Sequence, residues 1–179
     1  MLTCEWSKAD GWQAPHIRPY GDLRLPPSAS VLHYAIECFE GLKAYRDSSG
    51  TIRLFRPDMN MNRLLTAARR LALPHFDPQE LLQLIKRLVT LDSDWIPTEP
   101  GYSLYIRPAL IGTQDSLGVA PPNKALLFVI CSPVGPYYKT GFAAVSLYAE
   151  NRVVRAWPGG TGSFKIGAYQ PDTIGLLWW

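Results

Sequence analysis

The sequence has few cysteines, few histidines and no long apolar run. Its three cysteines, Cys4, Cys38 and Cys131, are too irregularly spaced for a disulfide framework or a zinc site, which favours a reducing compartment. Three histidines lie far apart, without the spacing of metal ligands. No segment approaches the ~18 apolar residues of a membrane span, and no signal peptide follows Met1.

Charge of one sign is also scarce. The net charge is +3, with 18% charged residues, which is too weak and too scattered to argue for nucleic-acid binding. There is no internal repeat and no low-complexity run. What is present is a globular composition, with 179 residues of which 47% are apolar. This is enough for one packed domain, or for one domain and part of another.

Periodicity and turn residues predict a strand-rich α+β domain over residues 1–134. Helical spacing over 60–73, with Asp58 as a possible cap, predicts one helix. Asp77-Pro78-Gln79-Glu80 is typical of a helix start, and the apolar spacing that follows extends to about Leu91. The strands are expected at residues 42–45 and 51–55, as a hairpin around 47–50, and at 102–111 and 125–131.

A second unit is expected to begin after a linker. Proline and glycine punctuate residues 135–143, and strand-like segments follow at 144–148 and 153–157. Residues 144–179 are therefore predicted to start a second domain. The first and last residues of the sequence both resemble the interior of a folded domain, so the chain is expected to be part of a longer protein.

The strongest local signal for chemistry is a lysine set between glycines. Lys165 lies in Gly159-Gly160-Thr161-Gly162-Ser163-Phe164-Lys165-Ile166-Gly167, flanked by Phe164 and Ile166. An apolar setting disfavours the ammonium form of a lysine, and a neutral amine can attack an aldehyde. Taken alone, the segment is better explained as a glycine-rich turn that carries a solvent-facing lysine. It is not a phosphate-binding P-loop, because no Ser or Thr follows the lysine.

Three weaker signals accompany it. Arg63 lies within the helix predicted after Pro57, where a guanidinium can bind a phosphate. Tyr105 and Arg107 share one face of a predicted strand, and a phenol beside a guanidinium can bind a carboxylate. The segment 39–45, Phe-Glu-Gly-Leu-Lys-Ala-Tyr, is by itself only a strand and a turn. Taken alone, Arg63 is better explained as an ordinary surface residue, and Tyr105 and Arg107 as part of a solvated strand face.

Together, the four signals resemble the eukaryotic-type branched-chain amino acid aminotransferases. The matching segments occur in the order and at the spacing of that family and extend over nearly the whole chain. They are LHYAIECFEGLKAY (32–45), RLFRPDMNMNR (53–63), SLYIRPALIGTQDSLGV (103–119), LLFVICSPVGPYY (126–138) and RAWPGGTGSFKIGA (155–168).

The resemblance implies the fold of class IV enzymes that use pyridoxal 5'-phosphate, in which a small domain, a linker and a large domain follow one another. The implied activity is reversible amino transfer between leucine, isoleucine or valine and 2-oxoglutarate, in a homodimer located in the cytoplasm or the mitochondrial matrix. Lys165 matches the lysine that binds the cofactor covalently, and Arg63 matches the arginine on its phosphate. Arg107 matches the group that receives the distal carboxylate of glutamate. The pocket for branched side chains matches Phe39, Tyr105 and Tyr137, and the residues lent to the neighbouring subunit match Tyr34, Leu117 and Val119.

The sequence departs from the family pattern after Lys165. The family tyrosine that contacts the cofactor is matched by Gln170 without a gap, or by Tyr169 with a one-residue deletion, which brings Pro171 near the usual proline. The chain also ends before most of the large domain, including the acid that pairs with the pyridine nitrogen. We therefore expect this chain alone to have little transaminase activity.

Two other functions are consistent with the same residues. The chain could be a catalytically inactive paralogue that only folds or dimerises. Within the same fold, a D-amino acid transaminase or an aminodeoxychorismate lyase is the other alternative. The segments FEGLKAY and YIRP argue against it, because they are typical of the branched-chain group.

Overall fold

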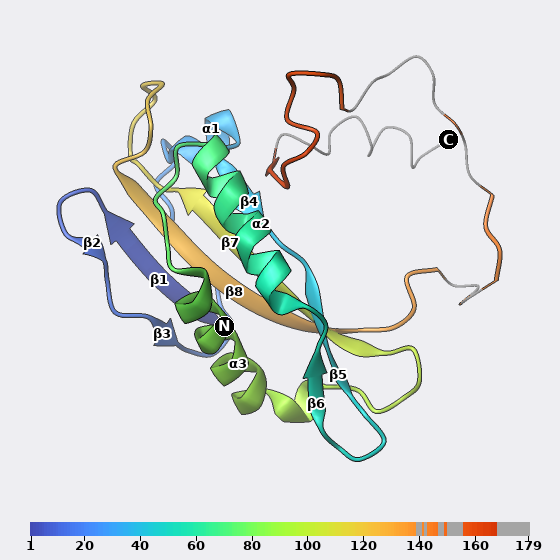
Figure 1. Ribbon diagram of the computed structural model, residues 1–179. Coiled ribbons are helices and arrows are strands. Elements are labelled where there is room, and N and C mark those ends of the chain that lie inside the picture. The colour runs from blue at the N-terminus through green and yellow to red at the C-terminus, as the bar shows by residue number, and fades with distance from the viewer. Residues whose placement is uncertain (139–140, 142, 147–148, 150–155, 168–179) are drawn as a thin grey trace.

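The computed structural model describes residues 1–138, 141, 143–146, 149 and 156–167. In this part of the chain, an antiparallel sheet of eight strands carries two long helices on one face (Figure 1). This confirms the expected α+β class. The elements in chain order are β1 (Leu2–Ser7), β2 (Gly11–Trp12), β3 (His16–Ile17), α1 (Ser30–Tyr34), β4 (Glu37–Phe39), β5 (Leu42–Arg46), β6 (Ile52–Leu54), α2 (Pro57–Arg70), α3 (Pro78–Leu91), the 3-10 helix η1 (Ser93–Trp95), β7 (Ser103–Gly112) and β8 (Lys124–Val134).

The long strand β7 organises the sheet, whose main strand order is β2-β1-β8-β7-β5-β6. One edge of β7 pairs with β8 along its whole length. The other edge pairs with two short strands in turn, β4 opposite residues 109–111 and β5 opposite residues 104–106. The chain therefore crosses from β4 to β5 at Glu40 and Gly41, where the Glu40 N–H donates to the Pro108 carbonyl at 2.9 Å.

Side chains alternate between the two faces of this sheet, as the pleat requires. On β7, Leu104, Ile106 and Leu110 are fully buried in the core shared with α2 and α3. Tyr105 and Arg107 therefore point to the opposite face. The same alternation continues along residues 38–44, so that Phe39 lies on the face of Tyr105 and Arg107 while Glu40 points toward the helices.

The helix predictions are largely confirmed. Helix α3 begins at Pro78, and the Asp77 side chain accepts hydrogen bonds from the backbone N–H groups of Gln79 and Glu80 at 2.7 and 3.2 Å. Asp58, however, does not cap α2. That helix begins earlier, at Pro57, and its cap is Arg56 in a left-handed conformation without a side-chain hydrogen bond. Proline suits the first helical position because its fixed φ is already helical.

The predicted hairpin around residues 47–50 is present between β5 and β6. Asp47 organises its turn, accepting hydrogen bonds from the backbone N–H groups of Ser49 and Thr51 and an ion pair from Arg53 at 2.9 Å. Hydrogen bonds from the Ser49 hydroxyl and the Arg53 side chain lower the pKa of Asp47 to about 2. This exposed ion pair lies outside the site built below.

The second predicted unit is only partly described. Of the strands expected at 144–148 and 153–157, residues 144–146 and 156–157 are described and adopt no strand, and the remaining residues lie outside the described part. The end of segment 156–167, at Lys165 and Ile166, lies beside β4 (Figure 1, red). None of the helices that the structure describes combines the length and the apolar character needed to cross a bilayer.

Candidate functional site

Lys165 lies against the sheet, at Phe39. Its carbonyl accepts a hydrogen bond from the Phe39 N–H at 3.2 Å, and the next residue, Ile166, forms an antiparallel bridge with Cys38. Ile166 is buried in the core, which fixes this stretch to the end of β4. The Lys165 Nζ lies 4.6 Å from the centroid of the Phe39 ring. The amine is thus held over an aromatic face rather than directed into open solvent.

Arg107 approaches the same phenylalanine from β7. Its guanidinium carbon lies 4.7 Å from the centroid of the Phe39 ring and 5.3 Å from that of the Tyr105 ring. The Arg107 Nη2 donates to the Tyr105 hydroxyl at 2.9 Å. Its Nε is buried and has no hydrogen-bond partner among the described residues. Arg107 is half-buried and forms no ion pair among the described residues, and such a cation is suited to an anionic ligand.

Arg63 is held on the helix side of the crossing between β4 and β5. Its Nε and Nη2 both donate to the carboxylate of Glu40, with Nη2 at 2.7 Å from Oε2. Glu40 has no exposed surface, whereas 54% of the Arg63 side chain is exposed. The hydrogen bond from Arg63 to Glu40 raises the pKa of the guanidinium, which therefore stays charged.

Gly41 makes room for Tyr105. A Cβ atom added to Gly41 would lie 2.1 Å from the Tyr105 hydroxyl oxygen and 2.9 Å from its Cζ, far inside van der Waals contact. The phenol therefore passes directly over the backbone at the crossing. Only glycine at position 41 leaves room for the Tyr105 ring where its hydroxyl accepts the hydrogen bond from Arg107.

Replacing Gly41 with alanine is expected to displace the Tyr105 ring and break its hydrogen bond with Arg107. The overlap should cost about 1–3 kcal/mol of unfolding free energy, measured by urea denaturation. Gly21→Ala is the matched control, because its Cβ would meet only Arg18 at 3.6 Å. In a Tyr105→Ala background, Gly41→Ala should cost almost nothing more. An undiminished cost there would show that Tyr105 is not what requires the glycine.

Tyr34, Leu117 and Val119 form a separate group in α1 and the loop after β7. The Tyr34 hydroxyl donates to the Leu117 carbonyl, which ties α1 to the loop after β7. All three side chains are exposed, Leu117 by 61% and Val119 by 83%. Within this single chain, none of them makes a described contact with Lys165, Phe39 or Arg107.

Among the described residues, Tyr137 makes no contact with the site. Tyr137 is 86% exposed and packs edge-to-face on Tyr138, with ring centroids 5.0 Å apart. It makes no described contact with Phe39 or Tyr105. Tyr169 lies outside the described residues, as does the alternative position Gln170.

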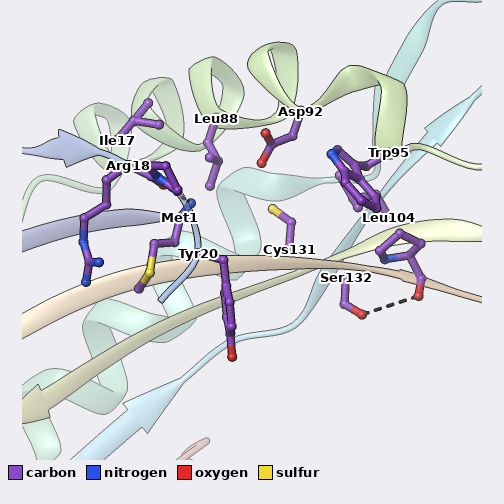
Figure 2. Close-up of a pocket in the computed structure, with 12 residues that line it drawn as sticks. Met1, Ile17, Arg18, Tyr20, Leu88, Asp92, Trp95, Leu104, Cys131 and Ser132 are labelled. Carbon is purple, nitrogen blue, oxygen red and sulfur yellow. Dashed lines mark hydrogen bonds between the residues drawn. The ribbon is translucent and has the colours of Figure 1, made fainter. Parts of the chain in front are cut away.

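A cavity of about 670 Å³ lies elsewhere, beneath α3 and near the end of β8 (Figure 2). Figure 2 shows Met1, Leu88, Asp92, Trp95 and Cys131 around it. It contains none of the predicted site residues. Arg18 and Cys131 also line this cavity, but burial raises the pKa of the Cys131 thiol to about 11, so the thiol stays protonated. We therefore place the site at Lys165.

Sequence reasoning assigned no role to Glu40, Gly41 or Asn60. The Asn60 side chain donates to the Glu40 carboxylate at 2.8 Å and to the Gly41 carbonyl at 3.2 Å. A signal was available for Glu40, since it occupies a core-facing position in the alternating series that includes Cys38 and Leu42. A carboxylate at such a position needs a charged partner. The partner Arg63 could not be identified from the spacing alone.

Comparison with known proteins places these residues in context. No protein-family model matches the chain. A branched-chain-amino-acid aminotransferase of Dictyostelium discoideum is 59% identical over 174 residues, which cover 97% of this chain and 46% of that protein. The cytosolic enzyme of Mus musculus is 58% identical, with 93% and 44% covered. The mitochondrial enzyme of Saccharomyces cerevisiae is 57% identical, with 99% and 45% covered. The chain thus spans slightly less than half the length of these relatives.

Solved structures of similar fold carry the same family name. The branched-chain amino acid aminotransferase of Escherichia coli has a TM-score of 0.64 at 20% identity, covering 96% of this chain and 53% of that one. The enzyme of Thermoproteus uzoniensis with norvaline has a TM-score of 0.57 at 21% identity, covering 78% and 43%. At such identities these structures support the fold alone. By sequence and by fold, the chain is a homologue of the branched-chain-amino-acid aminotransferases.

Proposed function

We propose that this chain contributes the lysine and the substrate-facing sheet of a branched-chain amino acid transaminase that uses pyridoxal 5'-phosphate. The reaction would be reversible amino transfer between leucine, isoleucine or valine and 2-oxoglutarate. One observation carries the proposal: the Lys165 amine lies over Phe39, which also contacts Arg107. This brings together a nucleophile, an apolar wall and a carboxylate-binding cation. The relatives' names support the same activity.

The residues present fit this cofactor. An aldehyde requires an amine, which Lys165 supplies, and a phosphate requires a fixed cation, which Arg63 supplies. Structures of the Thermus enzyme of this family are named as complexes with N-(5'-phosphopyridoxyl)-L-glutamate and with pyridoxamine 5'-phosphate. These names support pyridoxal phosphate as the cofactor here. The position of Tyr169 as a further contact remains a prediction.

Each side chain has a definable task in this reaction. When bound, the cofactor supplies an electron sink that makes the substrate's α-proton acidic. The Lys165 Nζ would accept and return that proton as a general base and acid. Phe39 and Tyr105 would exclude water and favour branched side chains, at roughly 0.8 kcal/mol per buried methylene. Arg107, through its guanidinium, would bind the distal carboxylate of glutamate or 2-oxoglutarate.

A homodimer is part of this proposal. Tyr34, Leu117 and Val119 expose apolar surface at α1 and in the loop after β7, and none of them makes a described contact with this chain's own Lys165. Exposed apolar groups of this kind are typical of interfaces, and the three would complete the neighbouring subunit's pocket. Tyr137 would join the pocket for branched side chains. We keep the division into a first domain over 1–134, a linker over 135–143 and the start of a second domain over 144–179.

The relatives support two compartments. One is named as cytosolic and another as mitochondrial. Both compartments are reducing, which suits three cysteines that are all free in the structure. We propose the cytoplasm or the mitochondrial matrix as the location of this protein.

Ligand binding tests the proposed function directly. The purified chain is titrated with pyridoxal phosphate by equilibrium dialysis, and the loaded chain is then challenged with 4-methylvaleric acid, which is named in a complex of the Thermus enzyme. We expect saturable cofactor binding, followed by a rise in thermal midpoint with 4-methylvaleric acid but not with the same concentration of acetate. Absence of cofactor binding would refute the proposal. Equal effects of both acids would refute the branched-chain pocket.

A further inference from the structure

Glu40 is an acidic side chain with no exposed surface, and it lies directly beside the candidate site. Taking a carboxylate out of water costs several kcal/mol unless charge and hydrogen bonds compensate it. A leucine at this core-facing position would pack without that cost. The buried carboxylate therefore needs compensating contacts, and its role follows from the residues that supply them.

Helix α2 supplies the carboxylate's main partners. Asn60 and Arg63 stand three residues apart on one face of that helix, and both donate to Glu40. The Gly41 N–H donates to the same carboxylate at 3.1 Å. Four donors thus hold the two oxygens. Because Arg63 contributes two parallel hydrogen bonds, the plane of its guanidinium is fixed as well as its position.

The opposite edge of that guanidinium remains free. Nε and Nη2 are used by Glu40, whereas Nη1 has no acceptor among the residues that the structure describes. The side chain is more than half exposed. An anion that arrives from solvent would therefore meet a donor whose orientation is already set, and little side-chain entropy would be lost on binding.

The neighbouring residue in the chain holds the lysine. Phe39 contacts the Lys165 amine through its ring and the Lys165 carbonyl through its backbone N–H. Glu40, the next residue, holds Arg63. Two consecutive residues, Phe39 and Glu40, thus contact the lysine and the arginine respectively.

We propose that Glu40 is a positioning residue that fixes Arg63 for the phosphate of pyridoxal phosphate. This inference rests on the proposed function. It assigns to Glu40 a role through Arg63 and no direct contact with the cofactor. The opposing possibility is that Glu40 only neutralises Arg63.

The two roles predict opposite results for Glu40→Gln, which keeps the shape and removes the charge. Loss of positioning should weaken binding of pyridoxal phosphate about tenfold, because a charge-assisted two-point contact is lost. Loss of neutralisation alone should tighten it, because Arg63 would no longer be opposed by a nearby negative charge. The sign of the change therefore separates the two.

The experiment measures binding of two probes to the purified chain by equilibrium dialysis: pyridoxal phosphate and pyridoxal, which lacks the phosphate. For Glu40→Gln we expect weaker binding of the first and unchanged binding of the second. In an Arg63→Gln background, Glu40→Gln should have no further effect on the ratio of the two affinities. Asp47→Asn, which breaks the exposed ion pair with Arg53, is the matched control and should change neither.

Two safeguards keep the test decisive. Should Glu40→Gln fail to fold, Asn60→Ala removes one donor to Glu40 and should weaken pyridoxal phosphate binding in the same direction by a smaller factor. The NMR signal of the Arg63 Nε–H should also exchange faster with solvent in that variant, without any ligand present. Exchange at the wild-type rate, with unchanged binding, would overturn the proposal.

The remaining outcomes are also distinct. Equal or tighter binding of pyridoxal phosphate by Glu40→Gln would overturn the positioning role and leave the proposed function intact. An equal loss for both probes would indicate a merely structural role and overturn it too. A wild-type chain that binds neither probe would overturn the proposed function, and the role of Glu40 with it.

Discussion

Replacing Lys165 with alanine is expected to abolish covalent trapping of pyridoxal phosphate on this chain. In the wild-type chain, borohydride reduction should leave a stable pyridoxyl label on the Lys165 peptide, because the ε-amine condenses with the aldehyde. Alanine has no nucleophile, so the label should fall to the background of surface lysines. Mass spectrometry of the digested chain measures this directly. The readout requires no turnover.

The local fold should tolerate this substitution. Segment 164–167 is anchored by the buried side chain of Ile166 and by the backbone hydrogen bond from Phe39 to the carbonyl of residue 165. Alanine keeps both. Lys86→Ala is the matched control. Lys86 is exposed on α3, and this variant should keep the full pyridoxyl label on Lys165. A full label on Lys165→Ala, or one shared evenly among all lysines, would contradict the assignment.

Much of the fold could be predicted because its signals are local. Helix α3 begins where Asp77 and Pro78 predicted it, since a side-chain cap and a proline act within one turn. Strands β7 and β8 correspond to runs of apolar residues. The sharing of one edge of β7 between β4 and β5 had no such signal, because it depends on pairing between distant segments.

In the candidate site, too, local signals could be predicted from the sequence and contacts between distant segments could not. The face shared by Tyr105 and Arg107 followed from the period of a strand, and the structure joins them by a hydrogen bond. The contact between Lys165 and Phe39 spans 126 positions of the sequence, and only family resemblance pointed to it. Glu40 was overlooked because a glutamate beside a glycine is usual in a turn. The alternation from Cys38 to Leu42 indicates its core-facing position, but its partner Arg63 lies 23 positions away and has no local signal.

The second large effect concerns α2 itself, the helix that carries Arg63. Leu64 is fully buried in the core between α2 and the sheet, and its carbonyl lies near the Cys38 thiol. Burial, and then the charges of Glu37 and Glu40, raise the pKa of that thiol to about 12, as expected of a dry and densely packed layer. Such a layer cannot readily collapse around a missing side chain.

Leu64→Ala is therefore expected to lower the free energy of unfolding by about 2–5 kcal/mol, from the lost burial and the cavity left behind. Leu91→Ala makes the same chemical change at a position that is 63% exposed on α3, and should cost less than about 0.5 kcal/mol. Urea denaturation of both variants measures the difference. Equal losses would show that α2 does not pack on the sheet as described. Because Arg63 precedes Leu64 on the same helix, Leu64→Ala should also weaken binding of pyridoxal phosphate more than Leu91→Ala does.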